Sequence, residues 1–132
     1  MGKARALKIS ACYIVKNEAK NLAKSIKSLK NQVNEIVVVD TGSTDNTITV
    51  ARKLGARVYS FPWQDDFSKA RNFALSKAKG DWLVLLDADE YFTAKTAGNI
   101  CQVIRQAHQA DALLIQMVNY DVDKAEIQDY FY

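Results

Sequence analysis

The residues of this sequence with the clearest chemical potential are the carboxylates that follow a short apolar run, Trp82–Leu86. Asp87, Asp89 and Glu90 come directly after that run, with Ala88 between the two aspartates. Carboxylates this close repel one another unless water, a proton or a cation neutralises them. Oxygen ligands at this density suit hard ions such as Mg²⁺ or Mn²⁺. We therefore predict a divalent-metal site on Asp87 and Asp89, and a polar loop after a core strand is the alternative.

A strand is the structure that best positions these carboxylates. The run Trp82–Leu86 is too short for a helix and follows the helix-breaking Gly80, which favours a buried strand. Side chains two residues apart share one face of an extended chain. Asp87 and Asp89 are therefore expected to project together from the end of this strand, with Ala88 pointing the other way.

Two more polar clusters also follow apolar runs that are typical of strands. Lys16-Asn17-Glu18 comes after Ile9–Val15, and a polar stretch that begins at Asp40 comes after Glu35–Val39. Apolar residues with a period near 3.6 lie between the strands and indicate helices. The other predicted elements are a helix marked by Leu22, Ile26 and Leu29, a helix at Ile48–Leu54 closed by Gly55, a strand at Ala56–Ser60, a helix at Ser68–Lys79 ended by Gly80, a helix marked by Ile100, Val103, Ile104 and Ala107, and a strand at Ala112–Val118.

The alternation of strands and helices predicts an α/β fold with a mainly parallel, Rossmann-like sheet and helices on both faces. A run without polar alternation, such as Glu35–Val39, is typical of a parallel strand that is covered on both sides. Ligands of such sheets bind outside the carboxyl ends of the strands. All three polar clusters follow strands, so we expect them to meet at the same edge of the sheet.

Asp40 closes the second predicted strand, where an acidic residue is well placed to accept hydrogen bonds from a ribose or a base. Gly42 and Ser43 offer backbone amides and a hydroxyl to the same ligand. A turn-capping role for Asp40 is the alternative, and the sequence does not decide between the two.

A bound phosphate group would need a cation here, because the sequence has neither a G-x-G-x-x-G nor a G-x-x-x-x-G-K-[ST] pattern. A divalent ion on Asp89, with Asp87 beside it, would bridge a diphosphate, and Arg71 would add a second positive charge. For Arg71, a surface ion pair with Asp65 or Asp66 is the alternative.

The composition is that of an ordinary globular protein, with 48% hydrophobic and 25% charged residues among 132. No apolar stretch reaches the ~18–20 residues of a membrane span, and the N-terminus lacks the apolar core of a secretory signal. We therefore expect a cytoplasmic protein with Cys12 and Cys101 as reduced thiols, and no nucleic-acid partner because no reading motif is present. Four lysines recur at helical spacing: Lys20, Lys24, Lys27 and Lys30. They indicate either a solvated helix face or weak peripheral contact with the inner face of an anionic membrane.

Four motifs stand in order along residues 8 to 92: Ile14–Glu18, Val38–Thr47, Trp63–Leu75 and Gly80–Glu90. With these motifs the sequence resembles the inverting family 2 glycosyltransferases of the GT-A fold. The resemblance is greatest for the branch that contains lipopolysaccharide-core glucosyltransferases, where a similar lysine-asparagine-glutamate and D-[ST]-G-S-T-D occur.

The resemblance implies that a nucleoside-diphosphate sugar, with a UDP-sugar favoured, binds at this edge together with Mg²⁺ or Mn²⁺. It implies Asp89 as the metal ligand of a D-x-D motif that assists the leaving diphosphate, and Asp87 as a ligand of the ribose or the metal. Many relatives carry an acidic residue at the position of Thr41, and that residue contacts the nucleobase. The identity of the nucleobase is therefore left open. The resemblance also implies nucleotide-sugar contacts for Ile14, Lys16, Asn17, Glu18, Asp40, Thr41, Gly42, Ser43, Arg71 and Ala88.

Relatives in this family place the acceptor pocket and the general base, an aspartate or a glutamate, well beyond the D-x-D strand. We therefore expect residues 1–132 to form a single nucleotide-sugar-binding domain, the N-terminal part of a larger enzyme whose general base is not in this chain. The acceptor would be a glycan, such as a lipopolysaccharide or another cell-envelope glycan, a lipid or a protein. A non-catalytic sugar-nucleotide-binding module and a haloacid-dehalogenase-like phosphatase are the alternatives.

Overall fold

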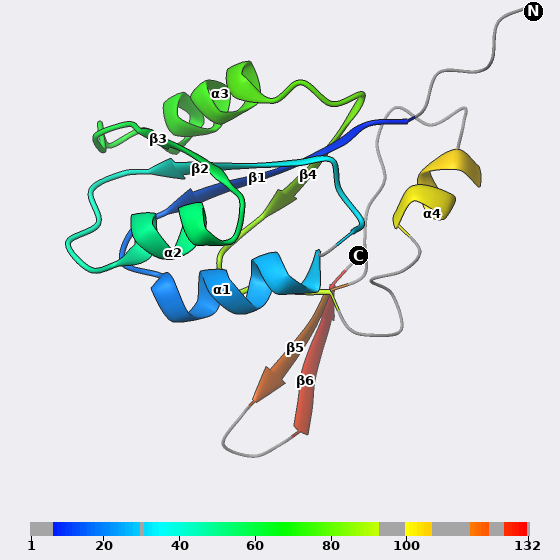
Figure 1. Cartoon of the computed structure of the whole chain (residues 1–132). Helices are drawn as coiled ribbons and strands as arrows, with labels where there is room; N and C mark the ends of the chain where they lie inside the picture. The colour runs from blue at the N-terminus through cyan, green and yellow to red at the C-terminus, as the bar shows by residue number, and fades with distance from the viewer. Residues whose placement is uncertain (1–6, 30, 93–99, 107–116, 122–125, 132) are drawn as a thin grey trace, which may run out of the picture. The chain divides into compact units, whose positions relative to one another are not determined.

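The computed structural model describes residues 7–29, 31–92, 100–106, 117–121 and 126–131 (Figure 1). The chain divides into two compact units, residues 1–101 and 102–132, and each is described by itself. The elements in chain order are β1 (Ile9–Val15), α1 (Ala19–Ser28), β2 (Glu35–Asp40), α2 (Thr47–Lys53), β3 (Arg57–Ser60), α3 (Phe67–Lys77), β4 (Trp82–Leu86), α4 (Ile100–Gln106), β5 (Met117–Asp121) and β6 (Glu126–Phe131).

The first unit is built on a four-stranded sheet in the order β3-β2-β1-β4. Every pairing in this sheet is parallel, and Cys12 of β1 lies between Val37 of β2 and Leu85 of β4. The predicted parallel α/β architecture is therefore confirmed. From β1, the strands β2 and β3 are added on one side and β4 on the other, so the strand order reverses between β1 and β4. Ligands of open α/β sheets bind at such a point, beyond the carboxyl ends of the strands.

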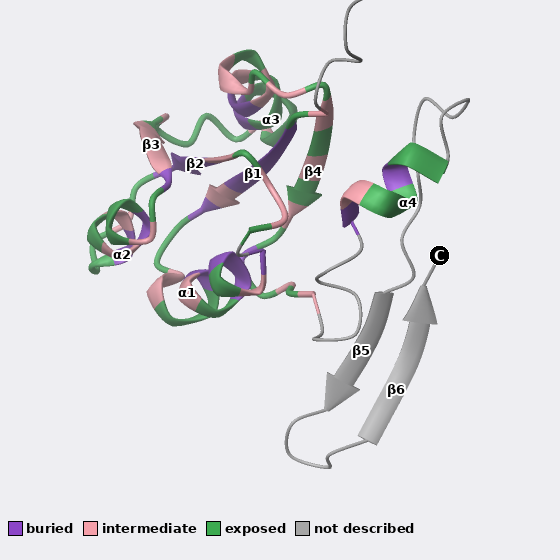
Figure 2. Ribbon diagram, turned by 45° about the vertical axis from the view of Figure 1, so that its right-hand side comes forward, coloured by how far each residue is buried: buried purple, intermediate pink, exposed green. Residues whose placement is uncertain are grey.

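Helices cover both faces of this sheet, with α3 on one side and α1 and α2 on the other (Figure 1). Successive residues of a strand point to opposite faces, and β1 shows this alternation. Cys12 packs on the α3 side with Val37, Val39 and Ala74. The neighbouring Tyr13 is fully buried on the other side, where its hydroxyl lies 2.6 Å from Ser25 Oγ of α1. β1 is consequently buried except at Ile14, and β2 is buried from Val37 to Asp40 (Figure 2).

The prediction for α3 was wrong at its C-terminal end, and the reason lies in Gly80. The helix ends at Lys77 because Ala78 is already extended, with φ −77° and ψ 138°. Gly80 instead allows close packing on β1, where its N–H donates to Ser10 Oγ at 2.8 Å. A Cβ on Gly80 would lie 2.7 Å from the backbone nitrogen of Ser10, so no larger residue fits there. Gly80 thus allows the segment before β4 to pack closely against β1, and it does not end the helix.

Two other boundaries agree with the sequence patterns. The helix α2 ends at Lys53 and is followed by Gly55 at φ 92°, a conformation that favours glycine. The last described helix, α4, covers Ile100–Gln106 and buries Ile100 and Ile104, as the apolar spacing predicts, whereas Val103 is exposed and Ala107 lies outside the described residues. No described helix is long and apolar enough to cross a membrane.

The second unit contains an antiparallel hairpin of β5 and β6. The predicted strand at Ala112–Val118 overlaps β5 only in part, since β5 is Met117–Asp121 and residues 112–116 lie outside the described residues. The second strand of this hairpin, β6, is Glu126–Phe131. The prediction that residues 1–132 form a single domain stays a prediction.

Both cysteines are free thiols, as the sequence predicts. Cys12 is buried in the centre of the sheet, and burial raises the pKa of its thiol to about 11, with a smaller contribution from the charge of Glu35. The thiol is therefore protonated near neutral pH, and Cys12 acts as a small core residue.

Candidate functional site

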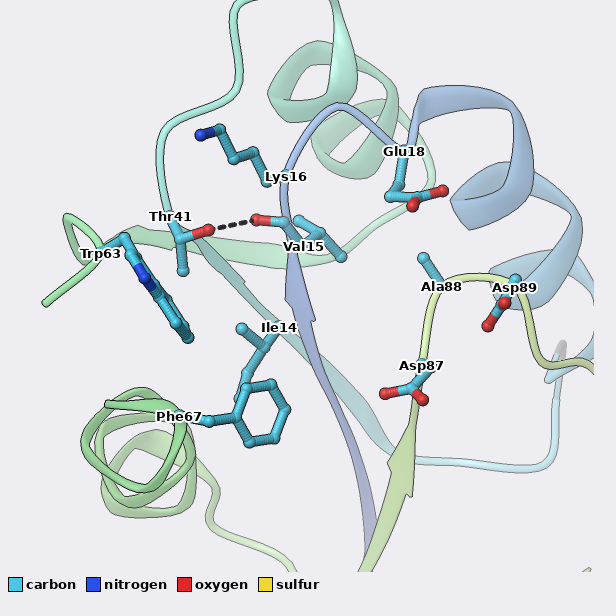
Figure 3. Close-up of a pocket in the computed structure, with 10 residues that line it drawn as sticks. All are labelled: Ile14, Val15, Lys16, Glu18, Thr41, Trp63, Phe67, Asp87, Ala88 and Asp89. Carbon is cyan, nitrogen blue, oxygen red and sulfur yellow. Dashed lines mark hydrogen bonds between the residues drawn. The ribbon is translucent and has the colours of Figure 1, made fainter. Parts of the chain in front are cut away.

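A cavity of about 480 Å³ lies at the carboxyl ends of the parallel strands (Figure 3). Its volume falls within the range of ligand sites in proteins, ~300–1,000 Å³. Residues from the ends of β1 and β4, from the segments after β2 and β3, and from the starts of α1 and α3 line it: Ile14, Val15, Lys16, Glu18, Thr41, Trp63, Phe67, Asp87, Ala88 and Asp89. The three polar clusters predicted to meet at one edge of the sheet do so here.

The carboxylate side of the cavity is a tight turn at the end of β4. Glu90 donates its N–H to the carbonyl oxygen of Asp87 at 3.0 Å, and Asp87 donates its N–H to Glu90 Oε1 at 2.7 Å. The expectation of an extended segment from Asp87 to Asp89 was therefore wrong, because this reciprocal pair folds the chain into a turn. Both aspartates nevertheless line the cavity, and their carboxylates lie on the same side, away from the Ala88 methyl group (Figure 3).

The charges of Asp87 and Asp89 act on the third carboxylate of this turn, Glu90. Burial raises the pKa of Glu90 above its ordinary value, and the charges on Asp87 and Asp89 raise it further, while the hydrogen bond from the Asp87 N–H acts in the opposite direction. The turn therefore concentrates negative charge on this side of the cavity.

The loops after β1 and β2 are joined by hydrogen bonds around Asn17. Its side-chain oxygen accepts from the backbone N–H groups of Thr44 at 2.7 Å and Asp45 at 3.2 Å. Its own N–H donates to Ser43 Oγ at 2.8 Å. The backbone of Asn17 is left-handed, with φ 53°, which asparagine tolerates better than most residues. Asn17 thus positions the two loops relative to each other and is not itself a lining residue.

Two further bonds tie the same loops together next to the cavity. Thr41 donates to the carbonyl oxygen of Val15 twice, from its N–H at 3.0 Å and from its hydroxyl at 3.1 Å (Figure 3). Glu18 donates its N–H to Thr47 Oγ1 at 3.0 Å. The cavity wall formed by the ends of β1 and β2 is therefore held from both sides.

Asp40 is buried at the end of β2, and only 2% of it is exposed. Its carboxylate accepts from the N–H groups of Gly42 at 3.1 Å and Ser43 at 2.9 Å, and from the Ser43 hydroxyl. These contacts are those of the turn-capping alternative. The prediction that Asp40 also faces a nucleoside stays a prediction, since neither Asp40, Gly42 nor Ser43 lines the cavity.

The side of the cavity opposite the carboxylates is aromatic (Figure 3). Trp63 lies in the loop after β3, and Phe67 begins α3, with 6.4 Å between their ring centroids. Arg71, one helical turn after Phe67, places its guanidinium carbon 4.9 Å from the centre of the Phe67 ring. Arg71 does not line the cavity itself, so it contacts the site through Phe67.

The structure thus brings seven of the predicted site residues to one cavity and gives five others a place around it. The lining ones are Ile14, Lys16, Glu18, Thr41, Asp87, Ala88 and Asp89, and the surrounding ones are Asn17, Asp40, Gly42, Ser43 and Arg71. Sequence reasoning missed Val15, Trp63 and Phe67 as lining residues. Large apolar rings in an otherwise polar loop after a strand were the signal for the two aromatics.

Residues 10–130 match the family model described as "Glycosyl transferase family 2". The chain belongs to this family. It is 48% identical over 90 residues to a TPR repeat-containing protein of Synechococcus elongatus, and the aligned region covers 68% of this chain and 22% of that protein. It is 38% identical over 118 residues to an uncharacterized glycosyltransferase of Rickettsia conorii, and the aligned region covers 89% of this chain and 41% of that protein. The chain therefore spans less than half the length of these curated relatives.

Among solved structures, the chain is similar to glucosyl-3-phosphoglycerate synthase from Mycobacterium tuberculosis in complex with Mn²⁺, UDP and glucosyl-3-phosphoglycerate. The TM-score is 0.55 and the identity 28%, over 64% of this chain and 36% of that chain. The GT-A fold predicted from the motifs is confirmed. The family match also decides against the phosphatase alternative. A particular kinship with lipopolysaccharide-core enzymes stays a prediction.

Proposed function

We propose that this chain carries the donor-binding part of an inverting glycosyltransferase that depends on Mg²⁺ or Mn²⁺. The donor is a nucleoside-diphosphate sugar, with a UDP-sugar favoured, and the acceptor is a glycan, a lipid or a protein. Family membership and the position of the cavity at the switch point between β1 and β4 support this function. The similar mycobacterial synthase, whose structure contains Mn²⁺ and UDP, supports the choice of ligands.

The observation that carries the proposal is the pair of aspartates on the cavity wall. Asp87 and Asp89 are exposed, and within the described part of the chain their carboxylate oxygens accept no hydrogen bond and form no ion pair. Unpaired carboxylate oxygens on one wall suit a hard cation. No group of three or more His, Cys, Asp or Glu residues that could hold a metal occurs in the described ranges. Mg²⁺ is commonly bound in this way, by one or two carboxylates that are completed by substrate phosphates and water.

The proposed roles of the residues follow from this arrangement. Asp89 and Asp87 hold the cation, which neutralises the negative charge that develops on the leaving diphosphate. Lys16, at the exposed end of β1, adds positive charge at the cavity edge. The general base that deprotonates the acceptor is assigned to a part of the enzyme outside this chain.

Calorimetric titration of the chain with UDP tests the metal dependence directly. We expect binding with Mn²⁺ and its loss with a chelator, and we expect Asp89→Asn to weaken UDP binding about tenfold or more in the presence of Mn²⁺. Asp81→Asn is the matched control, because Asp81 stands before the first residue of β4, at the opposite end from Asp87, and accepts from the Lys8 N–H at 3.0 Å. Equal UDP affinity with Mn²⁺ and with chelator would refute the proposal.

The proposal includes a location in the cytoplasm with weak contact at the inner face of the membrane. α1 exposes Lys20, Lys24 and Lys27, which lie at helical spacing on one face. Basic side chains next to an anionic leaflet contribute ~1 kcal/mol each to membrane attraction. Co-sedimentation with vesicles that contain or lack anionic lipid tests this contact, and equal recovery on both vesicle types would contradict it.

A further inference from the structure

We propose that Trp63 and Phe67 form a stacking wall that holds the base of the bound nucleotide. The inference rests on the proposed function, because it assigns the base end of the same cavity. Trp63 is 46% exposed and Phe67 is 43% exposed, although both rings line the cavity. Aromatic rings bind nucleobases through their faces, and such stacking is worth ~1–3 kcal/mol per base.

The exposure of these rings is unlike that of their aromatic neighbours. Phe61 and Phe73 stack on each other with 4.8 Å between centroids, and Tyr59 meets Phe73 edge to face at 6.2 Å. All three pack against the core cluster of the sheet. Trp63 and Phe67 are close in sequence to this group yet are left half-exposed beside the cavity. Since burial of an aromatic ring is favourable, the fold leaves this apolar surface available to a ligand.

The geometry of the wall leaves room for a planar group. The two rings are tilted by 57° at a centroid distance of 6.4 Å, so they do not stack on each other. Figure 3 shows both on one side of the cavity and Asp87 and Asp89 on the other, with Ile14 between them. A nucleoside diphosphate also has a planar base at one end and an anionic diphosphate at the other. The polarity of the cavity therefore fits only one orientation of this ligand, with the base on the aromatic side.

Both rings are held in place before any ligand binds. Trp63 donates its indole N–H to Asp65 Oδ1 at 3.0 Å. Phe67 opens α3 directly after Asp66, whose carboxylate accepts from the Ser68 N–H at 2.9 Å and caps the helix. Arg71 covers part of the Phe67 ring. A preorganised wall costs little conformational entropy on binding, which favours a role in ligand recognition.

The experiment compares UDP with ribose 5-diphosphate, which retains the sugar and the diphosphate but lacks the base. Both are titrated calorimetrically into the full chain with Mn²⁺. We expect Trp63→Ala and Phe67→Ala each to weaken UDP binding about tenfold, within the range known for base stacking. We expect neither substitution to change the affinity for ribose 5-diphosphate. Trp63→Phe, which keeps a ring, should retain most of the UDP affinity.

Tyr91→Ala is the matched control, because Tyr91 is also 46% exposed but does not line the cavity, and it should leave both affinities unchanged. A second readout uses tryptophan fluorescence in a Trp82→Phe background, in which Trp63 is the single remaining tryptophan of the chain. UDP should quench this emission, and ribose 5-diphosphate should not.

The outcomes separate the two proposals. If UDP binds with Mn²⁺ but the alanine variants bind it as tightly as the wild type, the stacking wall is refuted and the proposed function stands. An equal loss of UDP and ribose 5-diphosphate in Trp63→Ala would also refute the wall, because it would show a general disturbance of the site. If the wild type binds neither compound, the proposed function fails and the wall fails with it.

Discussion

Replacing Asn17 tests how the two polar loops of the site are held together. Asn17 has a left-handed backbone at φ 53°, and its side-chain oxygen accepts from the N–H groups of Thr44 and Asp45 at 2.7 and 3.2 Å. It is exposed and does not line the cavity. We therefore expect its substitution to change UDP affinity through the positions of the loops.

The expected cost of Asn17→Ala has two parts. Alanine in a left-handed conformation costs ~1–2 kcal/mol. The loss of the hydrogen bonds from the Thr44 and Asp45 N–H groups costs ~0.5–1.5 kcal/mol each, towards the lower end because the freed N–H groups are exposed to water, and the long bond from the Thr44 hydroxyl at 3.4 Å adds little. We therefore expect Asn17→Ala to lower the free energy of unfolding by ~2–4 kcal/mol. Asn17→Gly relieves the backbone strain but also loses the bonds and should fall between alanine and the wild type.

Asn17→Asp completes the series because aspartate tolerates the left-handed conformation and keeps an acceptor oxygen. It should stay within ~1 kcal/mol of the wild type, less than the cost of losing both bonds. Urea unfolding gives the stabilities, and calorimetry with UDP and Mn²⁺ gives the affinities. The expected stability order is wild type, aspartate, glycine and alanine, and UDP affinity should fall in the same order.

Asn31→Ala is the matched control for backbone strain. Asn31 is also left-handed, at φ 66°, and among the described residues its side chain forms no hydrogen bond. Its substitution should cost only the strain of ~1–2 kcal/mol and leave UDP affinity unchanged. If Asn17→Ala is no more destabilising than Asn31→Ala and binds UDP like the wild type, the loops do not depend on Asn17 and the reasoning is refuted.

Two further predictions concern the opposite end of the sheet. Gly80→Ala should lower the free energy of unfolding by ~1–3 kcal/mol, since the new methyl group would lie 2.5 Å from Ser10 Oγ and 2.7 Å from its backbone nitrogen; an unchanged melting temperature would contradict the packing described. Burial alone would raise the pKa of Glu35, but hydrogen bonds from Ser10 and the Lys79 N–H and the charge of Arg57 lower that pKa below 4.5. Glu35 therefore stabilises the fold above its unfolded pKa and loses this effect as the pH falls through its folded pKa. Glu35→Gln should cost ~1–3 kcal/mol at pH 7 and progressively less below pH 4.5 in urea unfolding, and a difference that does not depend on pH would show that the charge contributes nothing.

The sheet could be predicted because its central strands are buried on both faces. Apolar runs such as Glu35–Asp40 have no polar alternation, and only a sheet with helices on both sides accommodates them. The predicted turn signals also held at Gly55, whose positive φ is a local property of the chain. The role of Gly80 could not be predicted in this way, because its close contact is with Ser10, 70 residues away in sequence. Only the paired strands bring those two backbones together.

The site shows the same division between local and long-range causes. Asp87 and Asp89 could be located from their position after a buried strand, but the turn they form depends on the reciprocal bonds with Glu90. The sequence did not predict that the Asn17 side chain binds the loop after β2, 27 residues further along the chain at Thr44, and its predicted contact with the nucleotide stays a prediction. The orientation of a side chain between two loops depends on which loops the sheet places next to each other. A sequence pattern gives the loop but not its partner.

The two sides of the cavity are consequently held by different means. The loops after β1 and β2 are joined through Asn17 and Thr41, so that part of the cavity wall is fixed by bonds between separate elements, whereas Trp63 and Phe67 are held by bonds within residues 63–68. The carboxylate turn follows β4, which pairs with β1 alone within the four-stranded sheet, and the bonds between Asp87 and Glu90 are internal to the turn. Loops joined by long-range bonds fix one end of the cavity before a ligand binds. A turn whose bonds are internal can adjust its carboxylates to a cation and a diphosphate that arrive together, as the proposed metal-dependent donor site would require.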